Sequence, residues 1–101
     1  MSVTMIISSS AQPGQRDAVH QLWLEHLAPA AEANDAQQVV VWCDDANDED
    51  AFHLFEIYRD QEAMGANAQS PAFANYMGAV MSLLAGEPTV RMASARWSKG
   101  I

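Results

Sequence analysis

The sequence predicts an α+β fold in which strands and helices follow the order β-α-β-β-α-β. Three observations support this order. Two segments rich in β-branched and aromatic residues, QVVVWC and AFHLFEIYR, flank a polar loop, as the strands of a hairpin do. Apolar residues recur at three- and four-residue steps before this hairpin, and a second helical pattern follows it. A further β-rich segment lies near each end of the chain.

The first half of the predicted fold is one strand followed by one helix. Residues 3–8 are short, β-branched and followed by polar residues, which favours a strand. Pro13-Gly14 breaks the chain before the helix. Pro29 lies inside the helical pattern and removes a backbone hydrogen bond, so we expect the last turn to kink or fray. The apolar stripe of this helix consists of Val19, Leu22, Trp23, His26, Leu27 and Ala30.

The central hairpin is predicted from residues 38–43 and 51–59, with an acidic loop at residues 44–50 between them. Side chains alternate between the two faces of a strand. The face of the second strand that we expect to meet the helices carries Phe52, Leu54, Glu56 and Tyr58, and the opposite face carries His53, Phe55 and Ile57.

A short helix from about residue 60, a longer helix over residues 71–84 and a last strand over residues 89–97 complete the prediction. Ser70 suits the N-cap of the longer helix, Pro71 suits its first turn, and Gly86 ends it.

This order is that of ferredoxin-like folds, with a four-stranded antiparallel sheet and helices on one face, in a single domain over residues 1–101. The other sheet face would be left bare and partly apolar. We therefore expect a second copy of the chain to cover it, which gives a homodimer, a dimeric α+β barrel.

Composition excludes several classes of function. The net charge of -8 and the scattered Lys and Arg residues argue against nucleic acid as a partner. The lone Cys43 excludes an internal disulfide, and we expect it to be buried in its strand. The N-terminus lacks the pattern of a signal peptide, and its apolar run is too short to span a bilayer. These features predict a cytoplasmic protein with no membrane association.

No group of His, Cys, Asp or Glu residues has a recognised metal-binding spacing. The acidic loop at residues 44–50 lacks the ordered pattern, with its glycine and terminal glutamate, of a calcium loop. We expect a solvated hairpin loop, and neither a metal nor any other cofactor.

Several motifs resemble those of the antibiotic biosynthesis monooxygenase (ABM) superfamily, and the resemblance covers nearly the whole chain. It implies a dimeric α+β barrel. Several members oxidise polycyclic aromatic or quinol-type substrates with molecular oxygen and no metal or flavin, whereas others degrade haem or act on small signalling molecules. The motifs are Gln12-Pro13-Gly14, Phe55-Glu56-Ile57-Tyr58-Arg59-Asp60, Ala63 and Ser70-Pro71-Ala72-Phe73.

Compared residue by residue, the chain departs from the known site patterns of this family. Quinol-type members often carry histidine at the positions of Asn67 and Ala72. Haem-degrading members use Asn, Trp and His at the positions that are here Ile7, Asn67 and Met77. Because the axial histidine is missing at Met77, the resemblance does not imply haem degradation.

Glu56 is the first candidate catalytic residue. On the face of its strand that meets the helices, a carboxylate is costly to bury unless it is paired or neutral. One interpretation is a general base with a raised pKa that takes a proton from a phenol. The other is a structural ion pair with Arg91 or Arg96 of the last strand.

His26 is the second candidate, because it lies near the centre of the apolar stripe of the first helix. If the stripe and Glu56 face one pocket, His26 can act as a base near neutral pH. The alternative is a core histidine bonded to a backbone carbonyl that Pro29 leaves free. We expect His20 to be solvated and His53 to make a dimer contact.

Together these features predict a cofactor-independent monooxygenase that acts on a small aromatic or quinol-type substrate in an apolar pocket between sheet and helices. His26 or Glu56 would take the proton, Tyr58 would stack or hydrogen-bond, and Asn67 would orient a substrate oxygen. Two alternatives stay open: a non-catalytic barrel that binds a small apolar ligand or a protein partner, and an isomerase or decarboxylase. Further substrate contacts are expected from Trp23, Met64, Phe73 and Met77.

Overall fold

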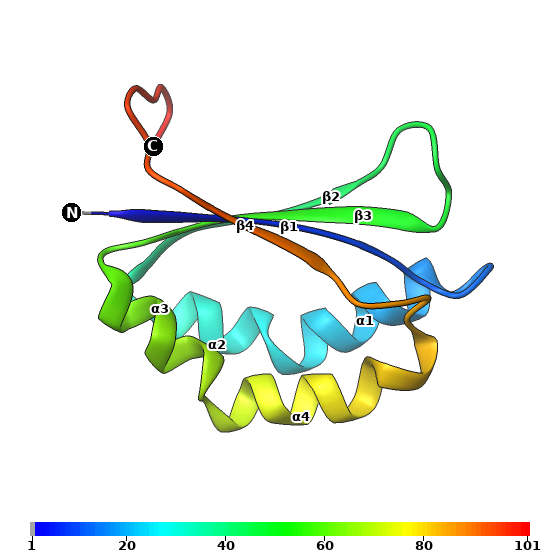
Figure 1. The fold of residues 1–101 in the computed structure, drawn as a ribbon. Helices are drawn as coiled ribbons and strands as arrows, with labels where there is room; N and C mark the ends of the chain where they lie inside the picture. Colours follow the sequence, from blue (N-terminus) through cyan, green and yellow to red (C-terminus); the bar gives the residue numbers. More distant parts are fainter. Residues whose placement is uncertain (1) are drawn as a thin grey trace.

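The computed structural model describes residues 2–101. Four strands form one antiparallel sheet in the order β2-β3-β1-β4, and the helices cover one face of it (Figure 1). The predicted fold class is therefore confirmed. In chain order the elements are β1 (Val3–Ser10), α1 (Arg16–His26), α2 (Ala28–Ala33), β2 (Gln37–Asp44), β3 (Ala51–Tyr58), α3 (Gln61–Ala68), α4 (Pro71–Val80), the 3-10 turn η1 (Met81–Leu83) and β4 (Thr89–Ala93).

Three boundaries differ clearly from the sequence-based prediction. The helix predicted over residues 71–84 ends at Val80 and is followed by the 3-10 turn η1. The first predicted helix is divided into α1 and α2, and Pro29 lies in the first turn of α2, where its missing N–H costs no helical hydrogen bond. The last strand ends at Ala93, where residue 97 was predicted. Ala93 pairs with Thr4, and β1 begins only one residue before Thr4, so little of β1 remains to extend the ladder.

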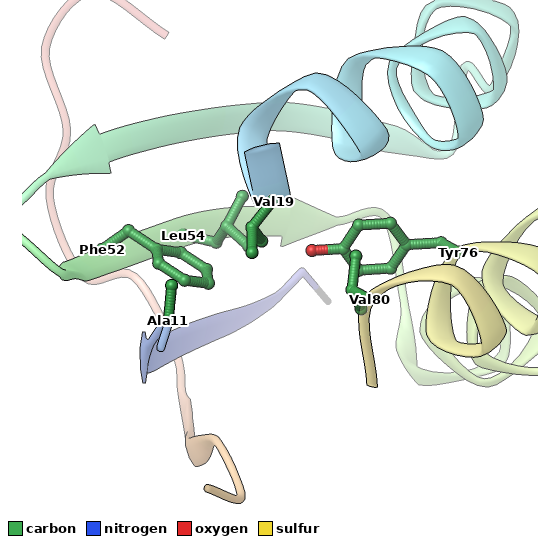
Figure 2. Close-up of a cluster of buried hydrophobic side chains, with 6 residues drawn as sticks. All are labelled: Ala11, Val19, Phe52, Leu54, Tyr76 and Val80. Carbon is green, nitrogen blue, oxygen red and sulfur yellow. The ribbon is translucent and has the colours of Figure 1, made fainter. Parts of the chain in front are cut away.

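The core lies between the sheet and the helix layer. Val19 of α1 and Val80 of α4 are fully buried, and helices α1 and α4 pack together over β3 and β1. Figure 2 shows how side chains from β3, the two helices and the end of β1 converge there. The cluster consists of Ala11, Val19, Phe52, Leu54, Tyr76 and Val80.

Both helices of the C-terminal half begin at a side-chain cap. The Asp60 carboxylate accepts a hydrogen bond from the Ala63 N–H at 2.8 Å, and the Ser70 hydroxyl accepts one from the Phe73 N–H at 3.2 Å. Pro71 follows Ser70 in the first turn of α4, as predicted. These caps fix the residues at which α3 and α4 begin.

Replacing Ser70 by alanine removes the cap of α4 and leaves the Phe73 N–H without its acceptor. We expect the free energy of unfolding in urea to fall by about 1 kcal/mol. Ser82→Ala is the matched control, because Ser82 is an exposed serine in the turn after α4 and should change stability little. Equal effects of the two changes would show that the cap does not stabilise α4.

Candidate functional site

A cavity of about 240 Å³ lies between the sheet and the helix layer. Its walls come from the helix-facing side of β1 and β3, from the start of β2, from helices α1 to α4, and from the chain around β4. Almost all of this lining is apolar, which excludes water from most of the cavity and strengthens electrostatic interactions inside it. The apolar lining includes Met5, Ile7, Trp23, Leu27, Phe52, Leu54, Met64, Phe73, Met77, Leu84 and Val90.

Four polar side chains gather at one end of this cavity. The Tyr58 hydroxyl donates to Glu56 Oε1 at 2.5 Å. Gln37 Nε2 donates to the same carboxylate oxygen at 3.0 Å and to the Tyr58 oxygen at 3.0 Å. Asn67 Nδ2 donates to the Tyr58 oxygen at 2.9 Å. All four residues line the cavity, and we call them the polar cluster.

Different elements supply the members of the polar cluster. Glu56 and Tyr58 are two residues apart on β3, so both face the helices. Asn67 comes from α3, which the Asp60 cap starts directly after β3. Gln37 begins β2 and pairs with Tyr58, and a bulge in the ladder separates it from Val39. This bulge places the Gln37 amide beside the carboxylate.

Burial changes the acidity of two members of the cluster. Desolvation raises the pKa of Glu56 above its ordinary value of 4.5, and the hydrogen bonds from Tyr58 and Gln37 offset only part of that rise. Desolvation also raises the pKa of Tyr58, and the hydrogen bond to Glu56 adds to the effect. Tyr58 therefore stays protonated, whereas Glu56 is a stronger base than an exposed glutamate.

Most of the residues predicted for the site meet in this cavity. Glu56, Tyr58 and Asn67 form its polar end, and the four apolar residues predicted to contact substrate, Trp23, Met64, Phe73 and Met77, all line it. His26 does not: it is half-buried at the end of α1 and is not among the residues that line the cavity. Within residues 2–101, the structure therefore does not bring His26 together with Glu56.

The alternative interpretation of Glu56, an ion pair with Arg91 or Arg96, is wrong. Arg91 pairs with Ile6 on β1, whereas Glu56 pairs with Met5, so the two side chains lie on opposite faces of the sheet. Arg96 is exposed beyond the end of β4. Within residues 2–101 the Glu56 carboxylate has neutral hydrogen-bond partners only, Tyr58 and Gln37.

Two further predictions are wrong. His20 was predicted to be solvated, yet it packs against the rings of Trp42 and Trp23, with ring centroids 4.6 and 6.2 Å away. Cys43 is exposed and not buried, because its side chain lies on the sheet face opposite the helices.

The dimer contact of His53 stays a prediction. Within the chain, His53 Nδ1 lies 2.9 Å from Ser8 Oγ and Nε2 lies 2.7 Å from Asp45 Oδ2. The hydrogen bonds of Asp45 with His53 and with the N–H groups of Asn47 and Asp48 lower the pKa of Asp45 to about 2.

Carboxylates of the acidic loop accept hydrogen bonds from backbone N–H groups of the same loop. Asp45 Oδ1 accepts from the N–H groups of Asn47 and Asp48, and Asp48 Oδ1 accepts from the N–H of Asp50. In the part of the chain that the structure describes, no group of three or more His, Cys, Asp or Glu residues could hold a metal ion. No helix among the described residues is long and apolar enough to cross a membrane.

Comparisons with known proteins relate the whole fold to one family. The family model for antibiotic biosynthesis monooxygenase (ABM) matches residues 2–79. No match was found among curated protein sequences. Many solved structures resemble the chain, and three examples follow.

A protein from Nitrosomonas europaea, described provisionally as an antibiotic biosynthesis monooxygenase, has a TM-score of 0.89 at 13% identity, over 98% of this chain and 94% of that chain. Rv0793 from Mycobacterium tuberculosis has a TM-score of 0.83 at 25% identity, over 100% of both chains. PA3566 from Pseudomonas aeruginosa has a TM-score of 0.82 at 20% identity, over 93% of both chains. The fold and the family model agree, and the chain belongs to the antibiotic biosynthesis monooxygenase (ABM) family.

Proposed function

We propose that this protein is a cofactor-independent monooxygenase that oxidises a small, neutral, quinol-type aromatic molecule with molecular oxygen. The observation that carries the proposal is a buried carboxylate at the end of an apolar cavity. One oxygen of Glu56 is fixed by two hydrogen bonds, and the other, Oε2, makes no hydrogen bond to any residue between 2 and 101. A base held in this way can meet a substrate hydroxyl inside the cavity.

The first step is proton transfer. Glu56 Oε2 takes the proton of a substrate hydroxyl, which leaves a neutral carboxylic acid and a substrate anion. The total charge in the cavity does not change, which matters because no Lys, Arg or His is among the described residues that line it. The raised pKa of Glu56 brings its basicity closer to that of a phenol and so favours the transfer.

The second step uses the electron-rich anion to reduce oxygen. A dihydroxyarene loses two hydrogens and gains one oxygen atom, giving a hydroxyquinone, and the second oxygen atom leaves as water. The substrate supplies all of the electrons for this reaction, so no external reductant is required. The apolar walls keep bulk water away from the substrate anion.

Tyr58 and His26 are less suitable bases than Glu56. The pKa of Tyr58 is raised by burial and by its bond to Glu56, so its hydroxyl keeps its proton and serves to hold the carboxylate. His26 is not among the described residues that line the cavity.

The proposed functional form is a homodimer formed through the sheet face away from the helices, where part of the apolar surface is exposed. Val41, Phe55 and Ile6 are register partners on three adjacent strands, and their exposed fractions are 44%, 37% and 36%. They form a continuous apolar row on the face away from the helices. A matching face of a second copy would cover this row, as the resemblance to the ABM family implies.

Replacing Glu56 by glutamine removes the base while keeping the shape of the side chain. We expect oxygen uptake with a panel of quinols and polycyclic phenols to fall by a factor of about 100 or more. His26→Ala is the control and should leave the rate essentially unchanged, since His26 does not line the cavity. Full activity of Glu56→Gln would overturn the mechanism, and bound ligand without oxygen uptake by the wild type would favour the non-catalytic barrel.

The pH dependence of the reaction should follow the protonation of Glu56. The base is active only when ionised, so activity should be lost as the pH falls through the raised pKa of this carboxyl, above 4.5. The measurement is kcat/KM for oxygen uptake as a function of pH, which reports groups of the free enzyme. An acid limb at or below 4.5 would argue against Glu56 as the base.

A charge in the apolar row should separate the dimer. We expect Val41→Glu to give a monomer in size-exclusion chromatography with light scattering, because a carboxylate in a desolvated interface is costly. Leu24→Glu is the matched control: Leu24 is similarly exposed, at 40%, but lies on α1 in the helix layer. A wild-type protein that is monomeric in this measurement would refute the proposed dimer.

A further inference from the structure

We propose that the polar cluster selects substrates that present two hydrogen-bond donors, such as a dihydroxyarene, over molecules with the same ring system that offer only acceptors. The inference deepens the proposed function, since it names the hydrogen-bonding groups that the substrate must carry. It rests on a count of the hydrogen atoms that Gln37, Glu56, Tyr58 and Asn67 already use among themselves.

Most donor hydrogens of the polar cluster form hydrogen bonds to other members of the cluster. The single hydroxyl hydrogen of Tyr58 is committed to Glu56 Oε1. The two hydrogens of Gln37 Nε2 serve Glu56 Oε1 and the Tyr58 oxygen. One hydrogen of Asn67 Nδ2 serves the Tyr58 oxygen. Of the donor hydrogens in the polar cluster, only the second hydrogen on Asn67 Nδ2 has no acceptor within the cluster.

The same count fixes the orientation of the Asn67 amide. Because the Tyr58 proton is given to Glu56, the Tyr58 oxygen can only accept from Asn67, so the contacting atom of Asn67 is nitrogen and not oxygen. Asn67 Oδ1 therefore points away from Tyr58. From standard covalent geometry, Asn67 Oδ1 and Glu56 Oε2 both lie within about 5 Å of the Tyr58 oxygen.

Both of these oxygens are available as acceptors. Among the described residues, neither Glu56 Oε2 nor Asn67 Oδ1 accepts a hydrogen bond. Neither atom is among the fully buried polar atoms that lack a partner, so both retain some accessible surface. Glu56 and Asn67 both line the cavity. Gln37 Oε1 is in the same situation, so this end of the cavity offers three acceptor oxygens and one donor hydrogen.

The remainder of the cavity does not reverse this preference. The Tyr76 hydroxyl also belongs to the cavity wall, but a hydroxyl rotates to donate or to accept and so does not discriminate. No cationic side chain among the described lining residues would attract an anion. A neutral ligand with two hydroxyl groups can donate to these acceptors, whereas a ligand with only ether or carbonyl oxygens leaves them unpaired, which is costly.

Three ligands with the same ring system and the same oxygen positions test the inference: 2,3-dihydroxynaphthalene, 3-methoxy-2-naphthol and 2,3-dimethoxynaphthalene, which offer two, one and no donors. Their affinities are measured by calorimetry under anaerobic conditions at pH 7.5, so that no oxidation occurs. We expect the diol to bind about tenfold more tightly than the monoether, and the monoether more tightly than the diether. Equal affinities, or no binding of any of the three, would overturn the inference.

Glu56→Gln provides the sharpest variant. The Tyr58 hydroxyl and the Gln37 amide still require an acceptor where Glu56 Oε1 lies. The new amide therefore turns its oxygen toward Tyr58 and Gln37 and its NH2 group toward the cavity. The preference should then move toward the diether, and the ratio of diol to diether affinity should fall by about tenfold or more. The bulk of the methyl groups is the same in both proteins, so a change in the ratio reports polarity and not size.

Asn67→Ala is the second variant, which keeps the inference testable if Glu56→Gln does not fold. It should reduce the advantage of the diol, whereas Asn75→Ala, an exposed asparagine of α4, should not. A wild-type preference that survives in both Glu56→Gln and Asn67→Ala would overturn the inference. Binding preference without oxygen uptake would refute only the proposed function, and oxygen uptake without preference would refute only this inference.

Discussion

A carboxylate enclosed between a sheet and its helices must be hydrogen-bonded, and this requirement connects the parts of the structure that matter for function. Glu56 meets it with partners from β2, from its own strand and, through Tyr58, from α3. None of these partners carries a charge, so burial is compensated by dipoles alone and the pKa of the carboxyl stays raised. A cationic partner would have lowered that pKa and produced a structural ion pair. Neutral partners leave the pKa of Glu56 raised, as the proposed role of a general base requires.

The apolar walls and the polar cluster depend on each other. The walls formed by side chains such as Trp23, Leu54 and Met77 lower the local dielectric constant and make each hydrogen bond at the polar end stronger. The polar cluster in turn gives the cavity a direction, because four of its polar side chains lie together at one end. In the proposed function, apolar residues thus supply most of the contact with the substrate, and the polar cluster orients it. The histidines that quinol-type members often carry at the positions of Asn67 and Ala72 are not needed for this arrangement.

The fold and most of the site could be predicted from the sequence, because they depend on local periodicity. Alternation along β3 placed Glu56 and Tyr58 on the helix side, and the Ser70-Pro71 pair marked the start of α4. Gln37 was missed, since a bulge interrupts the alternation of β2 where this residue lies, and no pattern in one strand reveals such an irregularity. His26 was placed in the cavity from its position on the helical stripe, but the break before α2 puts it at the last residue of α1. Tertiary packing decided both cases.

The exposed position of Cys43 has a practical consequence. It is the only thiol of the chain, and it projects from the edge strand β2 on the same sheet face as Val41 and Phe55. The rate at which a thiol reagent modifies the native protein therefore reports directly how accessible that face is in solution. No introduced label is needed, and the reporter lies away from the cavity, so the state of the face and the chemistry of the site can be followed independently in one sample.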